Sequence, residues 1–250
     1  MCTNYIPTRG DRLQQFFDVT DAGRTWRDEA YPGYMAPMIR SAQVDGPAGG
    51  QLPVCEAACF GLIPGWSRDG LNYRHCYNSR TETVAQKPSF RNAWRKRQFC
   101  LVPVDAFFEP NYESGRPVRW RIERRDGEPM ALAGIWEAWR RPPAESTGRS
   151  PGPTDAQVDE HGWLLSFALL TINADQHPVM RRFHPPDDEK RSVVVIPSAD
   201  RQDWLDGGGQ DPTRFWSGPD PDELRIVADP RPVAARKAPS IPRARPRQAS

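Results

Sequence analysis

Short runs of apolar residues separated by turn-forming residues dominate the chain, and most are typical of β-strands. Two continuous apolar runs, at 99–104 and 163–171, have the pattern of buried strands. A strand at 34–39 contains Pro37, which predicts an edge strand or an entry to a site. Other runs predict further strands, at 52–62, 118–123, 130–139, 193–196 and 224–227.

Helical spacing is confined to three short segments. Residues 11–19 predict a helix capped by Asp11, and residues 89–97 predict a basic helix capped by Ser89. A third short helix is expected from Ser198 to Leu205. Many short strands with few helices favour the α+β class, as one domain built on a curved, largely antiparallel β-sheet or barrel with a few short flanking helices.

Composition changes twice along the chain. Residues 141–162 are rich in Pro, Gly, Ser and Asp and lack periodicity, which predicts an insertion loop within a domain of residues 1–228. Residues 229–250 are rich in Pro and Arg, and we expect a disordered basic tail there. No internal repeat is evident.

The net charge of +2 over 250 residues does not by itself indicate or exclude a nucleic-acid partner. The charges are clustered, however, around Trp94 and in the tail. Cations interleaved with aromatic side chains suit single-stranded DNA, although a solvated helix face gives the same pattern. We find neither an apolar run of the ~18 residues that a membrane span needs nor a signal-peptide pattern. We therefore expect a soluble, cytoplasmic protein with no membrane partner, and a monomer by default.

Five cysteines, an odd number without a CxxC pair, predict buried reduced thiols rather than disulfides. A zinc site of Cys55, Cys59, His75 and Cys76 is an alternative, but the first two lie in an apolar strand-like run. We expect neither a metal nor a cofactor.

Cys2 directly follows the initiator methionine, and removal of Met1 would leave an α-amine and a thiol on adjacent carbons. Such an aminothiol captures aldehydes, because the amine forms an imine and the thiolate then closes a five-membered thiazolidine ring. An α-amine titrates near ~7.8 and a lysine near ~10.4, so the terminus is the best amine nucleophile of the chain. The alternative is that Cys2 is an ordinary thiol that happens to lie early.

Four blocks occur in a fixed order along the chain. They are Met1-Cys2, the Asn-x-Arg-x-Glu-Thr run at 78–83, Phe107-Phe108-Glu109, and Thr-x-x-Ala-Asp at 171–175 with a histidine after it. Together they resemble the SOS response-associated peptidase (SRAP) family, which crosslinks to abasic sites in single-stranded DNA. The resemblance extends from Cys2 to about Pro197, apart from the insertion, and includes the 60–66 run.

The resemblance implies roles for individual residues. Cys2 would form the thiazolidine with the ring-opened sugar, and Asn78 would hold the Cys2 end by a hydrogen bond. Glu109 would shuttle protons, and His184 would assist sugar opening and crosslink reversal, with His177 as the competing imidazole.

The resemblance also implies a DNA surface. Arg80 would contact the phosphate beside the lesion, Trp66 would stack on or wedge beside a base, and Lys87 and Arg191 are further candidates for phosphate contacts. The family often begins Cys-Gly-Arg, whereas this chain has Asn4 in place of that arginine. The implied function is a nucleoid-associated DNA-damage response protein that shields abasic sites in single-stranded DNA.

Two other functions remain open from the sequence. Cys2, Glu109 and His184 could serve a thiol peptidase, whose minimal form removes Met1 or a short leader. Alternatively, Trp66, Arg80 and the basic helix could bind a single strand without a covalent bond. Crosslinking ranks first because aldehyde capture by an aminothiol requires a terminal cysteine, and a peptidase nucleophile does not have to be terminal.

Overall fold

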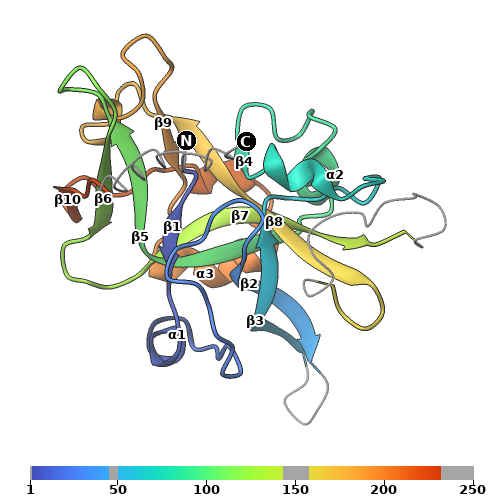
Figure 1. The fold of residues 1–250 in the computed structure, drawn as a ribbon. Coiled ribbons are helices and arrows are strands. Elements are labelled where there is room, and N and C mark those ends of the chain that lie inside the picture. Colours follow the sequence, from blue (N-terminus) through green and yellow to red (C-terminus); the bar gives the residue numbers. More distant parts are fainter. Residues whose placement is uncertain (1, 45–49, 143–157, 232–250) are drawn as a thin grey trace, which may run out of the picture.

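The computed structural model of the chain describes residues 2–44, 50–142 and 158–231 (Figure 1). Its helices are short: α1 (Asp11–Phe17), α2 (Arg91–Arg95), α3 (Arg201–Leu205) and the 3₁₀ turns η1 (Leu71–Arg74), η4 (Met180–Arg182), η5 (Ser198–Asp200) and η6 (Pro212–Phe215). Its strands are β1 (Tyr5–Pro7), β2 (Met35–Val44), β3 (Gly50–Phe60), β4 (Asn78–Arg80), β5 (Phe99–Asn111), β6 (Val118–Arg124), β7 (Met130–Arg140), β8 (Trp163–Asn173), β9 (Arg191–Val193) and β10 (Leu224–Ala228).

Five of these strands close into a barrel. β2 pairs with β3 and, at Ile39 and Leu101, with β5; β5 pairs with β7, β7 with β8, and β8 with β3. Ring closure removes most free sheet edges, and β6, β10, β4, β9 and β1 extend the sheet outside the ring. Among the described strands, only β3–β8 and β4–β8 are parallel pairs. The predicted fold, a curved and largely antiparallel sheet with few helices, is therefore confirmed.

Several element boundaries differ from the sequence prediction. β5 continues past residue 104 to Asn111, so Glu109 lies within a strand. β2 continues through Pro37 to Val44, so it is longer than the strand predicted at 34–39. Pro37 is tolerated because β2 meets β5 only at Ile39, which leaves the rest of that edge unpaired. The predicted caps were also wrong: Gly10 and Phe90 are the N-cap residues of α1 and α2.

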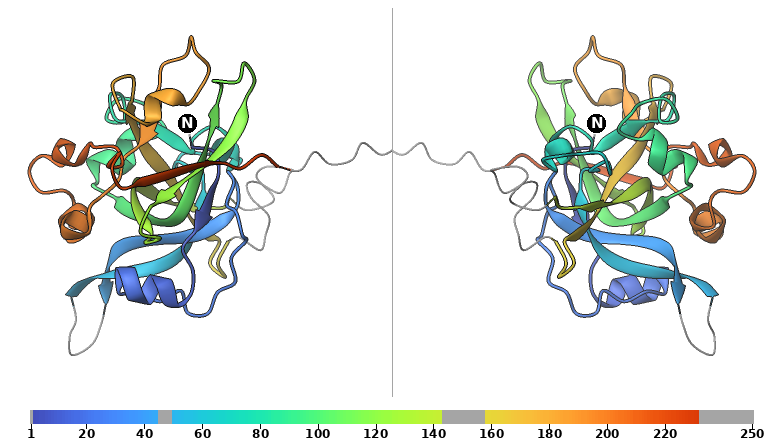
Figure 2. Two further views of the ribbon diagram at one scale, coloured as in Figure 1. Left: turned by 90° about the vertical axis from the view of Figure 1, so that its left-hand side faces the viewer. Right: turned by 90° about the vertical axis from the view of Figure 1, so that its right-hand side faces the viewer.

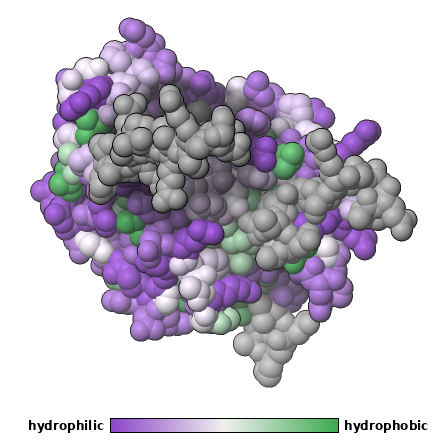
Figure 3. Space-filling model, in the orientation of Figure 1, coloured by the Kyte–Doolittle hydropathy of each residue, from purple (hydrophilic) through white to green (hydrophobic). Residues whose placement is uncertain are grey.

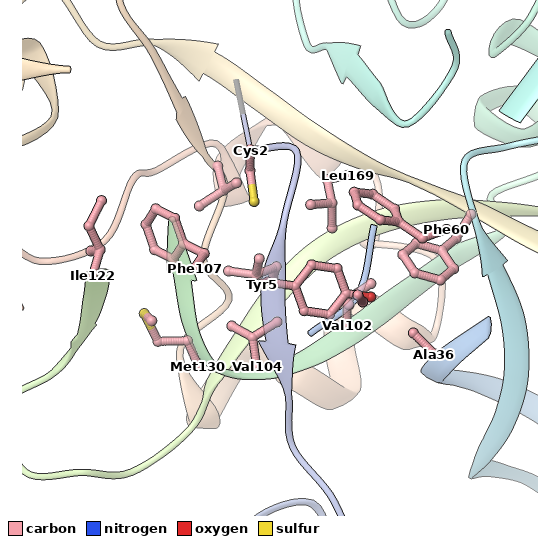
Figure 4. Close-up of a cluster of buried hydrophobic side chains, with 14 of the residues drawn as sticks. Cys2, Tyr5, Ala36, Phe60, Val102, Val104, Phe107, Ile122, Met130 and Leu169 are labelled. Carbon is pink, nitrogen blue, oxygen red and sulfur yellow. The ribbon is translucent and has the colours of Figure 1, made fainter. Parts of the chain in front are cut away.

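One hydrophobic cluster fixes the position of the N-terminal segment. Tyr5 of β1 packs edge-on against Phe60 of β3, with ring centroids 5.2 Å apart, and Phe60 stacks on Phe167 of β8 at 5.5 Å. The Cys2 side chain lies between Phe107 and Leu169 at the edge of this cluster (Figure 4). Because the cluster joins β1, β3, β5 and β8, core packing fixes the first residues of the chain against the barrel.

The N-terminus and helix α1 lie toward different ends of the molecule. In the side views of Figure 2, α1 and the β2–β3 pair lie at one end and the N-terminus lies toward the other. The described surface in Figure 3 is mainly hydrophilic, and the exposed large hydrophobic residues are Leu52, Trp66, Trp163 and Val227. No helix in the described ranges is long and apolar enough to span a membrane.

The predicted insertion and tail fall mostly outside the described residues. Of the insertion, residues 143–157 are not described, and of the tail, residues 232–250 are not described. The first tail residues contact the domain, since Asp229 pairs with Arg119 at 2.9 Å and Arg231 with Glu29 at 2.7 Å.

Candidate active site at the N-terminus

Pairing of β1 with β5 brings the N-terminus to Glu109. Tyr5 pairs with Phe107, and the backbone N–H of Phe108 donates to the carbonyl oxygen of Asn4 at 3.1 Å. Two residues further out, Cys2 lies beside the end of β5. Its side chain is fully buried, and its Sγ lies 3.6 Å from the carbonyl oxygen of Asn4.

The environment of Cys2 keeps its sulfur protonated. Burial, followed by the negative charge of Glu109, raises the pKa of the Cys2 thiol to about 12. At neutral pH the side chain is therefore a neutral thiol, and its attack on an electrophile requires a neighbouring base.

Glu109 and His184 form a buried pair. The His184 Nε2 lies 3.0 Å from Glu109 Oε2, and the two side chains are 9% and 1% exposed. His184 has a left-handed backbone with φ of 70°, which is uncommon outside glycine. The backbone N–H of His184 donates to the carbonyl oxygen of Pro110 at 2.9 Å, and the preceding Phe183 forms an isolated β-bridge with Asn111. These contacts with the end of β5 hold the imidazole beside the carboxylate.

Asn78, at the start of β4, also contacts Cys2. Its strand β4 runs parallel to β8, with Asn78 opposite Leu169. The Asn78 Nδ2 donates to the carbonyl oxygen of Cys2 at 2.8 Å. The structure thus brings together Cys2, Asn78, Glu109 and His184, four residues from four separate segments.

His177 is held elsewhere. Its Nδ1 accepts the backbone N–H groups of Val179 and Met180 at 3.2 and 3.0 Å, which assigns the ring proton to Nε2. Nε2 in turn donates to the carbonyl oxygen of Pro219 at 2.8 Å. Both ring nitrogens of His177 thus bond backbone groups, Nδ1 at the start of η4 and Nε2 at Pro219, and His184 is the imidazole beside Glu109.

Three of the expected DNA contacts lie at the surface. Trp66 is 53% exposed, and its indole N–H points to the carbonyl oxygen of Pro88 at 3.4 Å. Lys87, next to Pro88, is exposed. The Arg80 side chain is half exposed and pairs with Glu189 at 2.6 Å.

Arg191 differs from these three because its guanidinium points into the protein. Its side chain is 2% exposed. It bonds Glu82 at 2.8 and 2.9 Å, Glu189 at 2.7 Å and the carbonyl oxygen of Thr171 at 2.6 Å. Partial burial alone would raise the pKa of Glu82, but the hydrogen bonds from Arg191 lower it. This geometry favours a structural role for Arg191 over the expected phosphate contact.

The basic helix does not offer an open stacking face. The Trp94 ring packs against Phe99 and Trp216 at centroid distances of 5.1 and 6.1 Å, beside a second buried cluster that includes Phe99, Trp204 and Phe215. A DNA base could therefore stack on Trp94 only by displacing the ring of Phe99 or Trp216.

The cysteines do not form a metal site. All five are buried and none is in a disulfide. Cys55 and Cys59 belong to different hydrophobic clusters, which argues against the zinc alternative. Within the described ranges, no group of three His, Cys, Asp or Glu side chains is placed to hold a metal ion.

A surface cleft lies beside the pair of Glu109 and His184. It has a volume of about 640 Å³ and is lined by His184 together with Tyr112, Arg181 and Lys190. Because Glu113 and Asp175 also line it, the cleft gives a polar approach of mixed charge to His184 from solvent.

The sequence did not point to a set of contacts around Asn4. Asn4 is buried and its amide bonds Glu29 at 2.7 Å, and Glu29 also pairs with Arg119 of β6 at 2.7 Å. The only sequence signal was the asparagine itself, at a position where the SRAP family often has arginine.

Comparison with known proteins adds independent information. A family model described as SOS response associated peptidase (SRAP) matches residues 1–227. The abasic site processing protein YoqW of Bacillus subtilis is 25% identical over 154 residues, 61% of this chain and 58% of the relative. The abasic site processing protein YoaM of the same organism is 33% identical over 81 residues, 32% of this chain and 35% of the relative. The chain therefore matches less than two thirds of the length of these relatives.

Solved structures share the fold. A protein from Bordetella bronchiseptica superposes with a TM-score of 0.76 and 30% identity, over 91% of this chain and 99% of that one. A protein from Bacteroides thetaiotaomicron gives a TM-score of 0.64 at 17% identity, over 91% of each chain, which is a likeness of fold alone.

Proposed function

The chain belongs to the SOS response associated peptidase family, and from this premise we propose that it processes abasic sites in DNA through a covalent bond to Cys2. Two relatives carry the name abasic site processing protein. The observation that carries the proposal is the gathering of Asn78, Glu109 and His184 around a cysteine that removal of Met1 makes terminal.

The proposed reaction joins an aldehyde to an aminothiol with loss of one water. The Cys2 α-amine adds to C1 of the ring-opened deoxyribose, and the resulting carbinolamine loses water to give an imine. The S–H then adds across the C=N bond, so that a C–S bond forms and the thiol hydrogen ends on nitrogen. No oxidant or reductant is needed, and the reverse sequence restores the aldehyde.

The raised pKa of the thiol defines what Glu109 has to do. Because burial and the charge of Glu109 raise the pKa of the Cys2 thiol, the sulfur is protonated at neutral pH. A base must therefore take the thiol proton as the C–S bond forms, and Glu109 is the carboxylate whose charge reaches Cys2. His184, 3.0 Å from Glu109, orients that carboxylate and supplies a proton to the leaving water.

The same geometry favours aldehyde capture over peptide hydrolysis. A thiol peptidase depends on a thiolate stabilised by a histidine, which lowers the pKa of the cysteine. Here the Cys2 pKa is raised, and His184 Nε2 lies 3.0 Å from the carboxylate of Glu109. We rank the peptidase second on this ground.

We propose single-stranded DNA as the partner. Trp66 offers an exposed ring face for a base, and Arg80 and Lys87 offer cations for phosphates. An abasic nucleotide in a single strand has no base to hold its sugar in a stack, so its aldehyde can reach a buried thiol. A phosphate near Arg80 would compete with Glu189 for the guanidinium.

A denaturing gel tests the covalent bond. Protein whose lack of Met1 is verified by intact mass is incubated with a single-stranded oligonucleotide that carries one abasic site. We expect a slow band whose mass equals protein plus DNA minus one water, absent with an intact-base oligonucleotide and absent in Cys2→Ala. Cys2→Ser, which keeps the amine, should be trapped only after borohydride reduction. A wild-type protein that lacks Met1 and gives no such band would refute the proposal.

A further inference from the structure

Asn4 is held at both its side chain and its backbone. Its side-chain Nδ2 donates to Glu29 Oε2 at 2.7 Å, and the residue is 5% exposed. Its carbonyl oxygen accepts the N–H of Phe108 at 3.1 Å and lies 3.6 Å from the sulfur of Cys2. Asn4 therefore links Glu29, through its side chain, to β5 and to the sulfur of Cys2, through its carbonyl oxygen.

Glu29 is the centre of a charged network. Besides Asn4, it accepts the hydroxyl of Tyr31 at 2.6 Å and the guanidinium groups of Arg119 and Arg231, each at 2.7 Å. Burial alone would raise the pKa of Glu29, but the hydrogen bonds from Arg119 and Asn4 lower it. The side chain is thus a carboxylate at neutral pH, and charge-assisted hydrogen bonds to it are strong.

The network also reaches the strand that carries the base. The Arg119 guanidinium carbon lies 3.3 Å from the centroid of the Phe108 ring, and Phe108 directly precedes Glu109. Arg119 is 19% exposed and is further held by Asp229 at 2.9 Å. Contacts thus run from Phe108, next to Glu109, through Arg119 and Glu29 to Asn4, which is two residues from Cys2.

We propose that Glu29 is a positioning residue that, through Asn4, fixes the Cys2 amine and thiol relative to Glu109. Its loss slows covalent capture at saturating DNA and leaves non-covalent DNA binding unchanged. The inference rests on the proposed function, because it concerns the rate of that reaction. Its physical reason is that misplacement of a reacting group by about 1 Å can cost roughly a hundredfold in rate.

A reciprocal exchange of donor and acceptor tests this pair. Asn4→Asp places a second carboxylate against Glu29 and should lower the single-turnover crosslinking rate at saturating DNA by about tenfold to a hundredfold. The double variant Asn4→Asp with Glu29→Gln restores one donor, one acceptor and one negative charge, and should recover most of the rate. Asn92→Asp on α2 is the matched control, because its Oδ1 still accepts the bond from Arg95 and it lies outside the network.

Two further measurements separate positioning from other effects. Affinity for a strand carrying a tetrahydrofuran abasic analogue, which has no aldehyde, should stay within about twofold in all folded variants. Asn4→Ala, which removes the donor without adding charge, carries the test if Asn4→Asp does not fold.

The outcomes distinguish the two proposals. No crosslink by the wild type would overturn the proposed function itself. If the wild type crosslinks and either Asn4 variant crosslinks at the wild-type rate, the role of Glu29 is overturned. It is also overturned if the double variant crosslinks no faster than Asn4→Asp. A loss confined to analogue affinity would also overturn it, because Asn4 would then act in DNA binding.

Discussion

Replacing Arg191 with methionine distinguishes a structural role from a DNA contact. Methionine keeps an unbranched apolar stem but removes the guanidinium and with it every N–H donor of the side chain. The substitution leaves Glu82 and Glu189 without their shared cation, and it leaves the carbonyl oxygen of Thr171 without a bond that is 2.6 Å long in the native protein.

The size of the effect follows from burial. Breaking a buried ion pair by removing one partner costs about 3–5 kcal/mol. Arg191 is 2% exposed, but the side chains of Glu82 and Glu189 are 48% and 34% exposed and can rehydrate. We therefore expect the free energy of unfolding to fall by about 2–3 kcal/mol, below the full range for a buried pair.

Urea unfolding and a salt series measure the two roles separately. Unfolding is followed by tryptophan fluorescence, and DNA binding by anisotropy of a labelled single strand with a tetrahydrofuran site. Each phosphate contact contributes about 0.7 to the slope of log affinity against log salt for single strands. For Arg191→Met we expect lower stability and an unchanged slope.

Arg80→Met is the matched control. Its side chain is half exposed, so its ion pair with Glu189 should contribute less than about 1 kcal/mol to stability. Its slope should fall by about 0.7 if the proposed phosphate contact is made. An Arg191→Met protein as stable as the wild type, with a slope reduced by about 0.7, would refute the structural role and restore the phosphate contact.

Three other predictions follow from local geometry. Gly61→Ala should lower the free energy of unfolding in urea by at least about 2 kcal/mol, because Gly61 has φ of +114° and a Cβ would lie 2.3 Å from the carbonyl oxygen of Tyr73; wild-type stability would contradict this packing. Burial raises the pKa of Cys59 to about 12, so its stabilising effect is complete below pH ~8.5 and is lost as pH rises toward 12, at about 1.4 kcal/mol per pH unit. Between pH 9 and 11, the free energy of unfolding of Cys59→Ala in urea should fall with pH less steeply than that of the wild type, by about 1.4 kcal/mol per pH unit. Equal slopes for the two proteins would contradict this prediction. Trp66→Ala should weaken single-strand affinity by about 1–3 kcal/mol and leave the urea midpoint almost unchanged; unaltered anisotropy titrations would rule out a stacking role.

The elements of the fold were largely predictable because apolar patterns are local. Strands β6, β7 and β8 begin where alternation or apolar runs begin in the sequence. The end of β5 was missed because Asp105, Glu109 and Pro110 have the composition of a strand terminus. Pairing with β6 continues to Asn111, however, and the buried Glu109 is satisfied by contacts with distant segments. Such contacts are not encoded in local patterning.

Residue types in the site could be chosen from the sequence, but their surroundings could not. The resemblance singled out Cys2, Asn78 and Glu109, and it left two histidines open. Only the fold shows that His177 bonds backbone groups around η4 and that Arg191 is turned inward. Glu29 carried no signal, because a glutamate in a loop has meaning only once Asn4 and Arg119 are placed beside it.

Pairing of β1 with β5 has a consequence for the timing of biosynthesis. Tyr5 meets Phe107 only after about 100 further residues have been made, and Asn78 reaches Cys2 from 76 residues away. At ~5–20 residues per second, the N-terminus therefore spends roughly 5–20 s outside the ribosome before β5 exists to cover it. Until then the segment that holds Cys2 is exposed to solvent, and completion of the barrel buries the Cys2 side chain.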